Sequence, residues 1–352
     1  MGLAELKQKI KELVKQNKLT PEQQLLRDSV LLDQKRKNRD TEAKLKIAIE
    51  RIDEMKKSLS AFKATSDVSS YKLTGKSSKG GEATAVAVAS DWHYWETVQS
   101  KQVNGLNVFN KRVAKFRSDK FFANVAKLVK IYQNHSIIDT LILALLGDFM
   151  NNDIHPELAE SNQGLPMDEL LAVQDCFASG IEYILKNSNV DLLLPCQSGN
   201  HARTTIKTHI STEVGHSLEY IMYHNLARYF KKEKRVKFLI SRGYLLYVNV
   251  YGFMIRFHHG HAIKYGGGIG GATIPLNKAI AQWDKSQHAD LSVQGHLHTL
   301  KDGGNFIING SLVGYDDFAL RIKADYEKPK QAFFLVDHKR KEKTVTCPIF
   351  LD

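Results

Sequence analysis

The feature that most constrains the fold is a series of short apolar segments, each of which ends in a cluster of polar side chains. From Ala83 onward, these segments alternate with amphipathic stretches. Apolar runs of this length predict buried strands, and the amphipathic stretches predict helices. Polar residues that follow the strands are typical of α/β sheets, which place their sites at the carboxyl ends of strands. The sequence therefore predicts an α/β domain over residues 83–352.

The element predictions within this domain are specific enough to be compared with a structure. We expect strands over residues 83–89, 139–146, 190–196, 290–293, 306–309 and 331–336, and a hairpin formed by 244–250 and 253–257 around Tyr251-Gly252. We expect helices over residues 121–133, 170–186 and 217–232.

The first 64 residues have a different pattern, which predicts a basic helical arm. Apolar residues recur at helical spacing over 3–14, and Thr20-Pro21 followed by Gln23 predicts a second helix start. Apolar positions from Leu45 to Phe62 form one stripe, which favours pairing in a helical hairpin or a coiled coil, within the chain or between chains. The charged stretch 33–46 is either a solvated face or a face that contacts DNA or a partner protein. Residues 65–82, rich in Ser, Lys, Thr and Gly, predict a linker.

Charge is distributed unevenly along the chain. The formal net charge is +12, of which residues 1–80 carry +8 and the remainder +4. A basic balance of this size is typical of proteins with an anionic partner such as DNA. No apolar run reaches the roughly 18 residues that span a bilayer, and the N-terminus lacks the pattern of a signal peptide. We therefore expect no membrane partner and a cytoplasmic protein, in the host cytoplasm if a phage encodes it.

Cysteine spacing argues against both a disulfide framework and a cysteine–zinc site. The three cysteines, Cys176, Cys196 and Cys347, are far apart and form no C-x-x-C pair. We expect them to be buried, reduced thiols.

Five polar clusters carry the chemistry. They are Asp91-Trp92-His93, Gly147-Asp148, Gly199-Asn200-His201, His258-His259-Gly260-His261 and Gly295-His296-Leu297-His298. Carboxylate, amide and imidazole donors suit Mn, Fe or Zn. Taken singly, Asp148 is equally consistent with a helix cap. Taken singly, the cluster around His296 and His298 is also consistent with surface histidines in a loop. Five donor clusters in one globular region nevertheless indicate a two-metal hydrolase.

These clusters, in this order, resemble the motifs of the calcineurin-like metallophosphoesterase family. The resemblance extends over about residues 83–314, includes Asn309-Gly310-Ser311, and does not cover residues 1–80. It implies a four-layer α/β/β/α sandwich with two divalent ions, most often Mn, with Fe or Zn as alternatives. Carried over to this sequence, it implies one ion held by Asp91, His93 and His298, a second held by Asn200, His259 and His296, Asp148 as the bridge, and His201 as the general acid. We choose His259 over its neighbours His258 and His261 because the family uses the histidine directly before the glycine.

Two departures from the family pattern affect the substrate. Ala202 stands where a carboxylate often follows the Gly-Asn-His motif, and the arginine that Ser/Thr protein phosphatases place after the bridging aspartate is missing. The second departure argues against the hypothesis that the protein is a phosphoprotein phosphatase. Candidate substrate contacts are Arg203, Asn152, His261 and Tyr94. The glycine-rich stretch 264–271 is either a mobile loop of the site or a connector.

The preferred substrate is DNA. The basic arm and the aromatic residues Trp92, Tyr94 and Trp95 suit nucleic acid, unless those aromatic residues pack beneath the site. The pattern is similar to that of phage and bacterial DNA-repair nucleases of the family. The alternatives are a phosphodiesterase or phosphatase for a small substrate, such as a cyclic nucleotide or phosphomonoester, and a non-enzymatic scaffold.

Overall fold

The computed structural model of the chain describes residue 8 and residues 20–63, 68–73, 82–264 and 271–352. The chain divides into two compact units, Met1–Ser66 and Asp67–Asp352. The predicted helix over 3–14 and most of the glycine-rich stretch after Lys264 lie outside the described residues.

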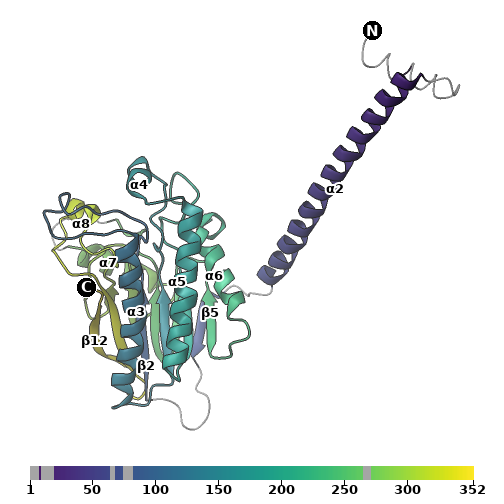
Figure 1. Cartoon of the computed structure of the whole chain (residues 1–352). Coiled ribbons are helices and arrows are strands. Elements are labelled where there is room, and N and C mark those ends of the chain that lie inside the picture. Colours follow the sequence, from purple (N-terminus) through teal and green to yellow (C-terminus); the bar gives the residue numbers. More distant parts are fainter. Residues whose placement is uncertain (1–7, 9–19, 64–67, 74–81, 265–270) are drawn as a thin grey trace. The chain divides into compact units, whose positions relative to one another are not determined.

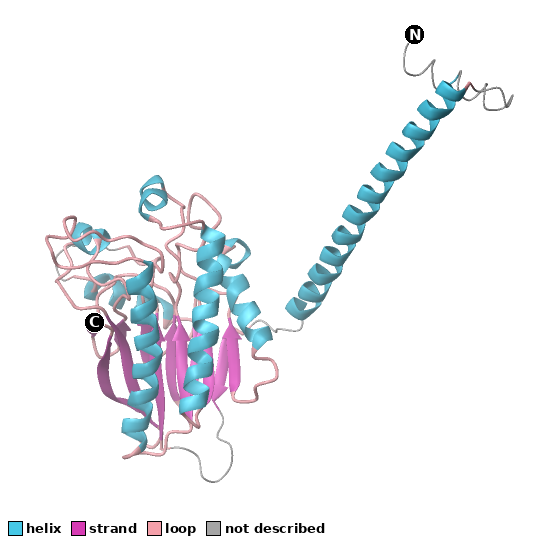
Figure 2. Cartoon of the chain, viewed as in Figure 1, coloured by secondary structure: helices cyan, strands magenta, loops and turns pink. Residues whose placement is uncertain are grey.

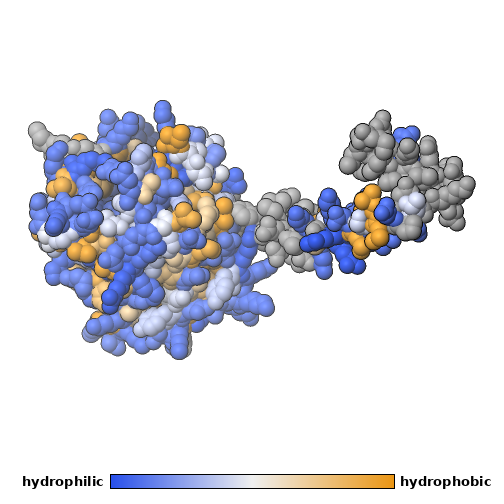
Figure 3. Space-filling view, turned by 45° about the horizontal axis from the view of Figure 1, so that its top comes forward, coloured by the Kyte–Doolittle hydropathy of each residue, from blue (hydrophilic) through white to orange (hydrophobic). Residues whose placement is uncertain are grey.

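The described part of the first unit is one long helix, α2, over Pro21–Lys63. It begins at the predicted proline, and the backbone N–H of Gln24 donates to the carbonyl of Thr20. Between residues 25 and 32 the helix exposes a patch of apolar side chains, orange on the arm in Figure 3; its members are Leu25, Leu26, Val30, Leu31 and Leu32. The predicted stripe is represented only by Leu45, which is exposed, since the side chains from Ile47 to Lys63 lie outside the description.

The second unit contains two six-stranded mixed sheets, which we call sheet A and sheet B. Sheet B has the order β12-β11-β2-β3-β4-β5, and its strands β2 to β5 are parallel neighbours. Their bounds are β2 Ala83–Ala89, β3 Thr140–Leu145, β4 Asp191–Cys196, β5 Val236–Ile240, β11 Lys330–Asp337 and β12 Glu342–Phe350. The predictions for β2, β3, β4 and β11 are confirmed to within two residues, whereas β5 and β12 were not predicted.

Sheet A has the order β1-β6-β7-β8-β10-β9. Its strands are β1 Ser70–Leu73, β6 Leu246–Val250, β7 Phe253–Phe257, β8 Leu291–Gln294, β9 Lys301–Asp302 and β10 Phe306–Ile308. The predicted hairpin is confirmed as antiparallel β6 and β7. The linker prediction for residues 65–82 is wrong at Ser70–Leu73, because this segment pairs in parallel with β6. Its four residues alternate between exposed and half-buried, so they lack the apolar run that marks a buried strand.

The two sheets face each other across a shared core. One apolar cluster combines side chains of sheet B, such as Val86 and Ile142, with side chains of sheet A, such as Val248 and Ile255. Helices α3, α5 and α6 cover the other face of sheet B (Figures 1 and 2). On the side of sheet A, Leu276 of α7 packs with Phe306 of β10. The unit is therefore a mixed α/β sandwich.

The helices of this unit that the sequence predicted are those with a long apolar stripe. They are α3 Lys111–Gln133, α4 Pro156–Ser161, α5 Pro166–Asn187, the 3₁₀ helix η1 Glu213–His216, α6 Leu218–Tyr229, α7 Thr273–Trp283 and α8 Asp317–Ile322. The predictions for α3, α5 and α6 are confirmed in type, and α3 begins ten residues earlier than expected because Asn110 caps it. No helix in the described part of the chain combines the length and apolar character that crossing a membrane requires.

Candidate metal centre

The five polar clusters converge because they follow strands that end at the same edge of the sandwich. Strands β2, β3 and β4 are parallel neighbours in sheet B, and β7 and β8 are parallel neighbours in sheet A. The backbone N–H of His296, after β8, donates to both carboxylate oxygens of Asp91, after β2, at 2.9 and 3.0 Å. The site is therefore built from both sheets.

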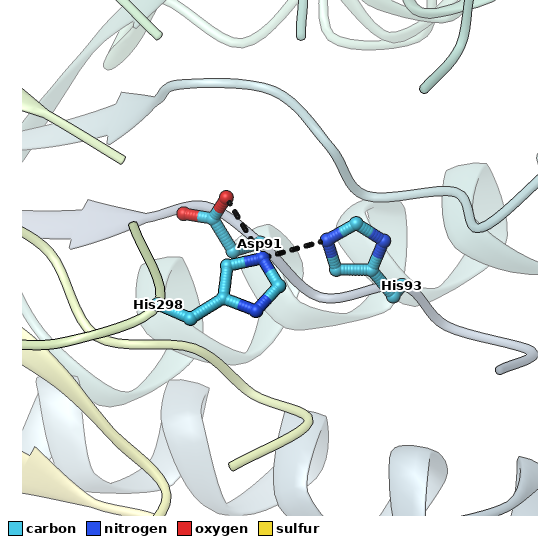
Figure 4. A group of neighbouring side chains, drawn as sticks. All are labelled: Asp91, His93 and His298. Carbon is cyan, nitrogen blue, oxygen red and sulfur yellow. Dashed lines mark hydrogen bonds and ion pairs between the residues drawn. The ribbon is translucent and has the colours of Figure 1, made fainter. Parts of the chain in front are cut away.

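The first donor group consists of Asp91, His93 and His298 (Figure 4), and all three side chains are buried. The Nε2 atoms of His93 and His298 lie 3.1 Å apart. His298 Nε2 is also 3.6 Å from Asp91 Oδ1. One donor atom from each residue lies within 4.8 Å of the others, which is compact enough to surround one ion.

The second donor group consists of Asp148, His259 and His296, with Asn200 beside it. His259 Nε2 is 2.9 Å from Asp148 Oδ2 and 3.2 Å from Asn200 Oδ1. Asp148 also shares a third group with His93 and His201. Asp148 therefore has donor neighbours on both sides.

The geometry at His259 and His298 fits cations better than it fits the bare side chains. In each ring, Nδ1 is already bonded, to the carbonyl of Leu146 at 2.7 Å for His259 and to Asp316 Oδ2 at 2.8 Å for His298. An imidazole whose Nδ1 carries the proton has a lone pair at Nε2. His259 Nε2 faces oxygens of Asp148 and Asn200, and His298 Nε2 faces His93 Nε2 and Asp91 Oδ1, so each contact needs a proton or a metal ion between the two atoms. These buried His/Asp clusters could therefore hold metal ions.

The pKa values of the two aspartates move in opposite directions. Burial raises the pKa of Asp91, despite the opposing charges of His298 and His259. Burial also acts to raise the pKa of Asp148, but His259 and His201 outweigh it and hold that pKa well below its ordinary range. Burial lowers the pKa of His259, but Asp148 and its hydrogen bond outweigh this and raise it to about 10. Asp148 and His259 thus form a buried ion pair.

Backbone strain is concentrated at the candidate ligands. Five of the seven, Asp91, His93, Asp148, His296 and His298, have a positive φ between 40° and 71°. Non-glycine residues rarely adopt this conformation, and where it occurs it clusters at functional sites. Such positions persist only when the surrounding contacts fix them, so the sandwich holds these side chains in one arrangement.

The glycines before the ligands allow two loops to approach each other closely. Gly147 has a φ of +84°, and a Cβ there would lie 2.1 Å from Gly199 N. A Cβ at Gly199 would lie 2.1 Å from Asp148 Oδ1. The glycines in Gly147-Asp148 and Gly199-Asn200 are therefore a packing requirement of the site.

The predicted general acid His201 lies against the bridge. Its backbone N–H donates to Asp148 Oδ1 at 2.7 Å, and its ring is 4.4 Å from that of His93. Since Ala202 follows it, the sequence left open what orients the ring. The structure answers this with a backbone carbonyl, because Nδ1 donates to Asn151 O at 3.0 Å. Nε2 is therefore the atom available for proton transfer.

Two buried carboxylates that the sequence analysis did not identify hold the loops of the site. Glu219 Oε1 accepts from Phe149 N at 2.7 Å, and its Oε2 accepts from Gly199 N at 2.8 Å. Glu169 accepts from the backbone N–H groups of Trp95, Asn151 and Asn152. Both glutamates lie in the first turn of a helix, where an acidic residue is expected for the helix dipole alone. Local sequence therefore gave no signal for this role.

Asp316 is a third residue that the sequence did not reveal. Its Oδ2 holds His298, and its Oδ1 caps α8 by accepting from Ala319 N at 2.7 Å. Its N-cap role was predictable from the helix that follows, but its contact with His298 depends on the tertiary fold.

A cavity of about 590 Å³ opens beside the donor groups. It is lined by His93, Asp148, Asn200, His201, His296 and His298 on the side of the candidate ligands. The lining also includes the acidic residues Glu96, Glu157, Asp316 and Asp317, together with Arg321. Any substrate at the donor groups would share this mixed-charge cavity.

The predicted contacts Arg203 and Asn152 have structural partners. Arg203 donates to the carbonyls of Asn200, Thr205 and Ile206 and also contacts His155. Asn152 Nδ2 donates to the carbonyls of His201 and Arg203. These side chains hold the loop after β4, which leaves little donor capacity for a phosphate.

Two of the three aromatic residues expected to contact nucleic acid are packed in the interior, whereas Trp95 is half-buried. Trp92 is 0 % exposed and stacks on Phe177 with ring centroids 4.6 Å apart. Tyr94 is 4 % exposed and lies near Ser118 and Cys176. For these two residues the alternative of packing beneath the site is correct, because their side chains face helices α3 and α5.

The three histidines around Gly260 lie in different environments. His259 alone joins a donor group among the described residues. His258 packs 4.9 Å from the ring of Trp283. His261 Nε2 is 3.3 Å from Glu213 Oε1, and its ring is 5.4 Å from that of His259. The preference for His259 is consistent with this arrangement.

Comparisons with known proteins leave the family of the chain open. No model of a known protein family matches it, and no curated protein matches it. Among solved structures, a hypothetical protein from Pyrococcus horikoshii is 12% identical over 76% of this chain and 89% of its own, with a TM-score of 0.37. A hypothetical protein from Thermus thermophilus is 8% identical over 76% and 97%, with a TM-score of 0.30. A novel phosphatase from Mycoplasma pneumoniae is 12% identical over 76% and 92%, also with a TM-score of 0.30.

TM-scores this low do not establish a shared fold. The function is therefore inferred from the geometry of the site.

Proposed function

We propose that this protein is a dinuclear-metal-dependent phosphodiesterase of the four-layer calcineurin-like type. One observation carries the proposal: two groups of buried donors meet at Asp148, with His259 Nε2 2.9 Å from Asp148 Oδ2 and the Nε2 atoms of His93 and His298 3.1 Å apart. Carboxylate, amide and imidazole donors suit Mn, Fe or Zn. Asp91, His93 and His298 would hold one ion. Asn200, His259 and His296 would hold the other ion, and Asp148 would bind both.

The residues of the chain divide the work of phosphodiester hydrolysis. When bound, two such ions lower the pKa of an attacking water and stabilise the charge that develops on the phosphoryl group. His201 is fixed through Nδ1, so when its ring carries a second proton at Nε2, that nitrogen can donate it to the departing alkoxide and the ring returns to the neutral form. Glu169 and Glu219 hold the loops that carry these groups. Their contacts keep the metal donors and the acid His201 in fixed positions relative to each other.

Within this class, we propose DNA as the substrate. The formal charge of +12, two thirds of it in residues 1–80, supports a polyanionic partner. The described part of the arm, α2, carries a dense run of basic residues between Lys35 and Lys46. The interior position of Trp92 and Tyr94 removes the aromatic argument, so the proposal depends on charge.

A small phosphodiester is the second candidate, and the cavity favours it. Its lining includes the acidic residues Glu96, Glu157, Asp316 and Asp317, although burial raises the pKa of Glu96 well above its ordinary range. An acidic lining suits a compact, singly charged diester better than a polyanion.

The test compares substrates with and without Mn²⁺. The purified chain would be incubated with Mn²⁺ or with EDTA on linear duplex DNA, circular single-stranded DNA and bis-p-nitrophenyl phosphate. Asp148→Asn should abolish all Mn²⁺-dependent turnover, while Asp153→Asn, an exposed carboxylate five residues away, should not. Cleavage of DNA supports the nuclease, and turnover of the small ester alone supports the second candidate. If no ester is hydrolysed with Mn²⁺, Fe²⁺ or Zn²⁺, the proposed function is wrong.

A further inference from the structure

Two neighbouring asparagines after β3 differ completely in how their side chains are bonded. The carboxamide of Asn152 is fully used: Nδ2 donates to His201 O and Arg203 O, and Oδ1 accepts from Asp153 N. The carboxamide of Asn151 has no hydrogen-bond partner at either atom within the described part of the chain. Asn151 is nevertheless 0 % exposed. Buried amides without partners are rare because they lose their hydrogen bonds to water.

The backbone around Asn151 is fixed, so its side chain cannot escape this position cheaply. Its N–H donates to Glu169 Oε1 at 2.7 Å, and the next N–H donates to Glu169 Oε2 at 3.0 Å. Its carbonyl accepts from His201 Nδ1 at 3.0 Å. Rotating this segment would break the bond that orients His201, so the backbone that carries the unpartnered amide stays in place.

Asn151 lines the same cavity as the candidate ligands Asp148 and His93 and the candidate acid His201. A polar group on a rigidly held backbone beside such a site is a feature of ligand recognition. Asn151 therefore has the position, the unused hydrogen-bonding capacity and the fixed backbone of a residue whose partner arrives with the substrate.

We propose that the carboxamide of Asn151 binds the phosphoryl group of the substrate, with Nδ2 donating to one of its oxygens. This inference rests on the proposed function and names a residue that recognises the substrate of that site. Arg203 cannot take the role without giving up its contacts to backbone carbonyls. Arg321 is the one guanidinium among the described residues that line the cavity, and its charge acts on the neighbouring Asp317. A neutral donor in an acidic cavity suits the single charge of a diester.

The experiment replaces Asn151 by leucine, which has nearly the same shape but no hydrogen-bonding atoms. Dissociation constants for Mn²⁺, and for inorganic phosphate with Mn²⁺ present, would be measured by calorimetry, alongside Tm and the kinetics on bis-p-nitrophenyl phosphate. We expect N151L to keep its Mn²⁺ affinity and a Tm at least equal to that of the unmodified protein. Phosphate binding and kcat/KM should fall by roughly 10- to 100-fold, the usual effect of removing a hydrogen bond to a charged group.

The matched control is Asn152→Leu. Its carboxamide holds the loop of His201 and Arg203, so N152L should lower Tm. Where N151L does not fold, N151A provides the same comparison with a smaller side chain.

The outcomes separate this inference from the proposed function. If N151L binds phosphate and turns over the ester as the unmodified protein does, Asn151 is not a substrate contact. If N151L loses Mn²⁺ affinity in parallel with phosphate, the residue supports the metal centre and the inference is wrong. If the unmodified protein neither binds phosphate nor hydrolyses esters with any cation, the proposed function fails and the inference fails with it.

Discussion

The two donor groups contain the same residue types but differ in how their charge is balanced. Around Asp148, His259 lies 2.9 Å away, and the pair is ionised because each partner favours the charged form of the other. Around Asp91, the nearest imidazole nitrogen of His298 is 3.6 Å away, and burial raises the pKa of the carboxyl. His298 takes its short contact from Asp316 instead, at 2.8 Å.

The difference shows that the histidines of the two halves are paired with carboxylates in different places. His259 pairs with Asp148 inside its own donor group. Burial lowers the pKa of His298, but Asp316, which lies outside the donor groups, outweighs this and raises it to about 9. We therefore expect changes at Asp148 to affect both folding and metal binding, and changes at Asp91 to affect metal binding almost alone.

The largest effect is expected for Asp148→Asn. Metal-dependent turnover should be lost, and the cation-free protein should lose about 3–5 kcal/mol of unfolding free energy, because His259 is left as a buried charge without its partner. Urea denaturation of the EDTA-treated protein measures this loss. A stability equal to that of the control Asp153→Asn would show that the ion pair does not form.

The pH dependence of that loss follows from the same pair. Asp148 contributes stability above its ordinary pKa of 3.8, and the contribution disappears as the pH falls through its lowered folded-state pKa. His259 contributes fully below its ordinary pKa of 6.5, and the contribution declines as the pH rises toward about 10. The difference in unfolding free energy between the unmodified protein and Asp148→Asn should therefore be largest between pH 3.8 and pH 6.5 and should decrease above pH 6.5. A difference that grows from neutral to alkaline pH would contradict this assignment.

His201→Asn tests the acid that lies between the groups. We expect kcat to fall by about 10²- to 10⁴-fold, while affinity for Mn²⁺ changes little because His201 is not among the predicted ligands. The decrease should be smaller for bis-p-nitrophenyl phosphate than for an ester with a poor leaving group, since nitrophenolate needs little protonation. Equal decreases on both esters would argue against proton donation.

Asp316→Asn should weaken metal binding only in the donor group of Asp91, His93 and His298. Removal of a carboxylate that orients a ligating histidine typically costs about 10- to 100-fold in metal affinity. Calorimetric titration with Mn²⁺ should show one of two binding steps weakened and the other unchanged. Because Asn can still accept from Ala319 N, the cap of α8 is retained. Weakening of both steps would mean that the two groups are not independent.

The smallest effect on folding is expected for Asp91→Asn. Since the nearest imidazole nitrogen lies 3.6 Å from the Asp91 carboxylate, no short ion pair is lost, and the neutral amide should change the unfolding free energy of the cation-free protein by about 1 kcal/mol or less. Metal binding to the first group should still be lost. Urea denaturation beside Asp148→Asn gives the comparison directly, and equal losses in the two variants would remove the proposed asymmetry.

The sequence alone determined the class of the fold and the position of the candidate ligands along the chain. Apolar runs such as Ala83–Ala89 and Leu141–Leu146 predict buried strands because burial on both faces leaves no room for polar residues. Each donor cluster follows such a run, and parallel strands bring their carboxyl ends to one edge. Asp91, Asp148 and Asn200 could therefore be placed together before the structure was known.

Only the tertiary structure decided which other side chains serve the site. Glu169, Glu219 and Asp316 lie at the starts of helices, where a local capping or dipole role accounts for them equally well. Their contacts with loops far away in the sequence arise from packing of the helices on the sheets. The same holds for Trp92 and Tyr94, whose burial depends on α3 and α5 covering them. Local sequence encodes periodicity and caps, whereas the partner of a buried polar group is fixed by which elements meet in space.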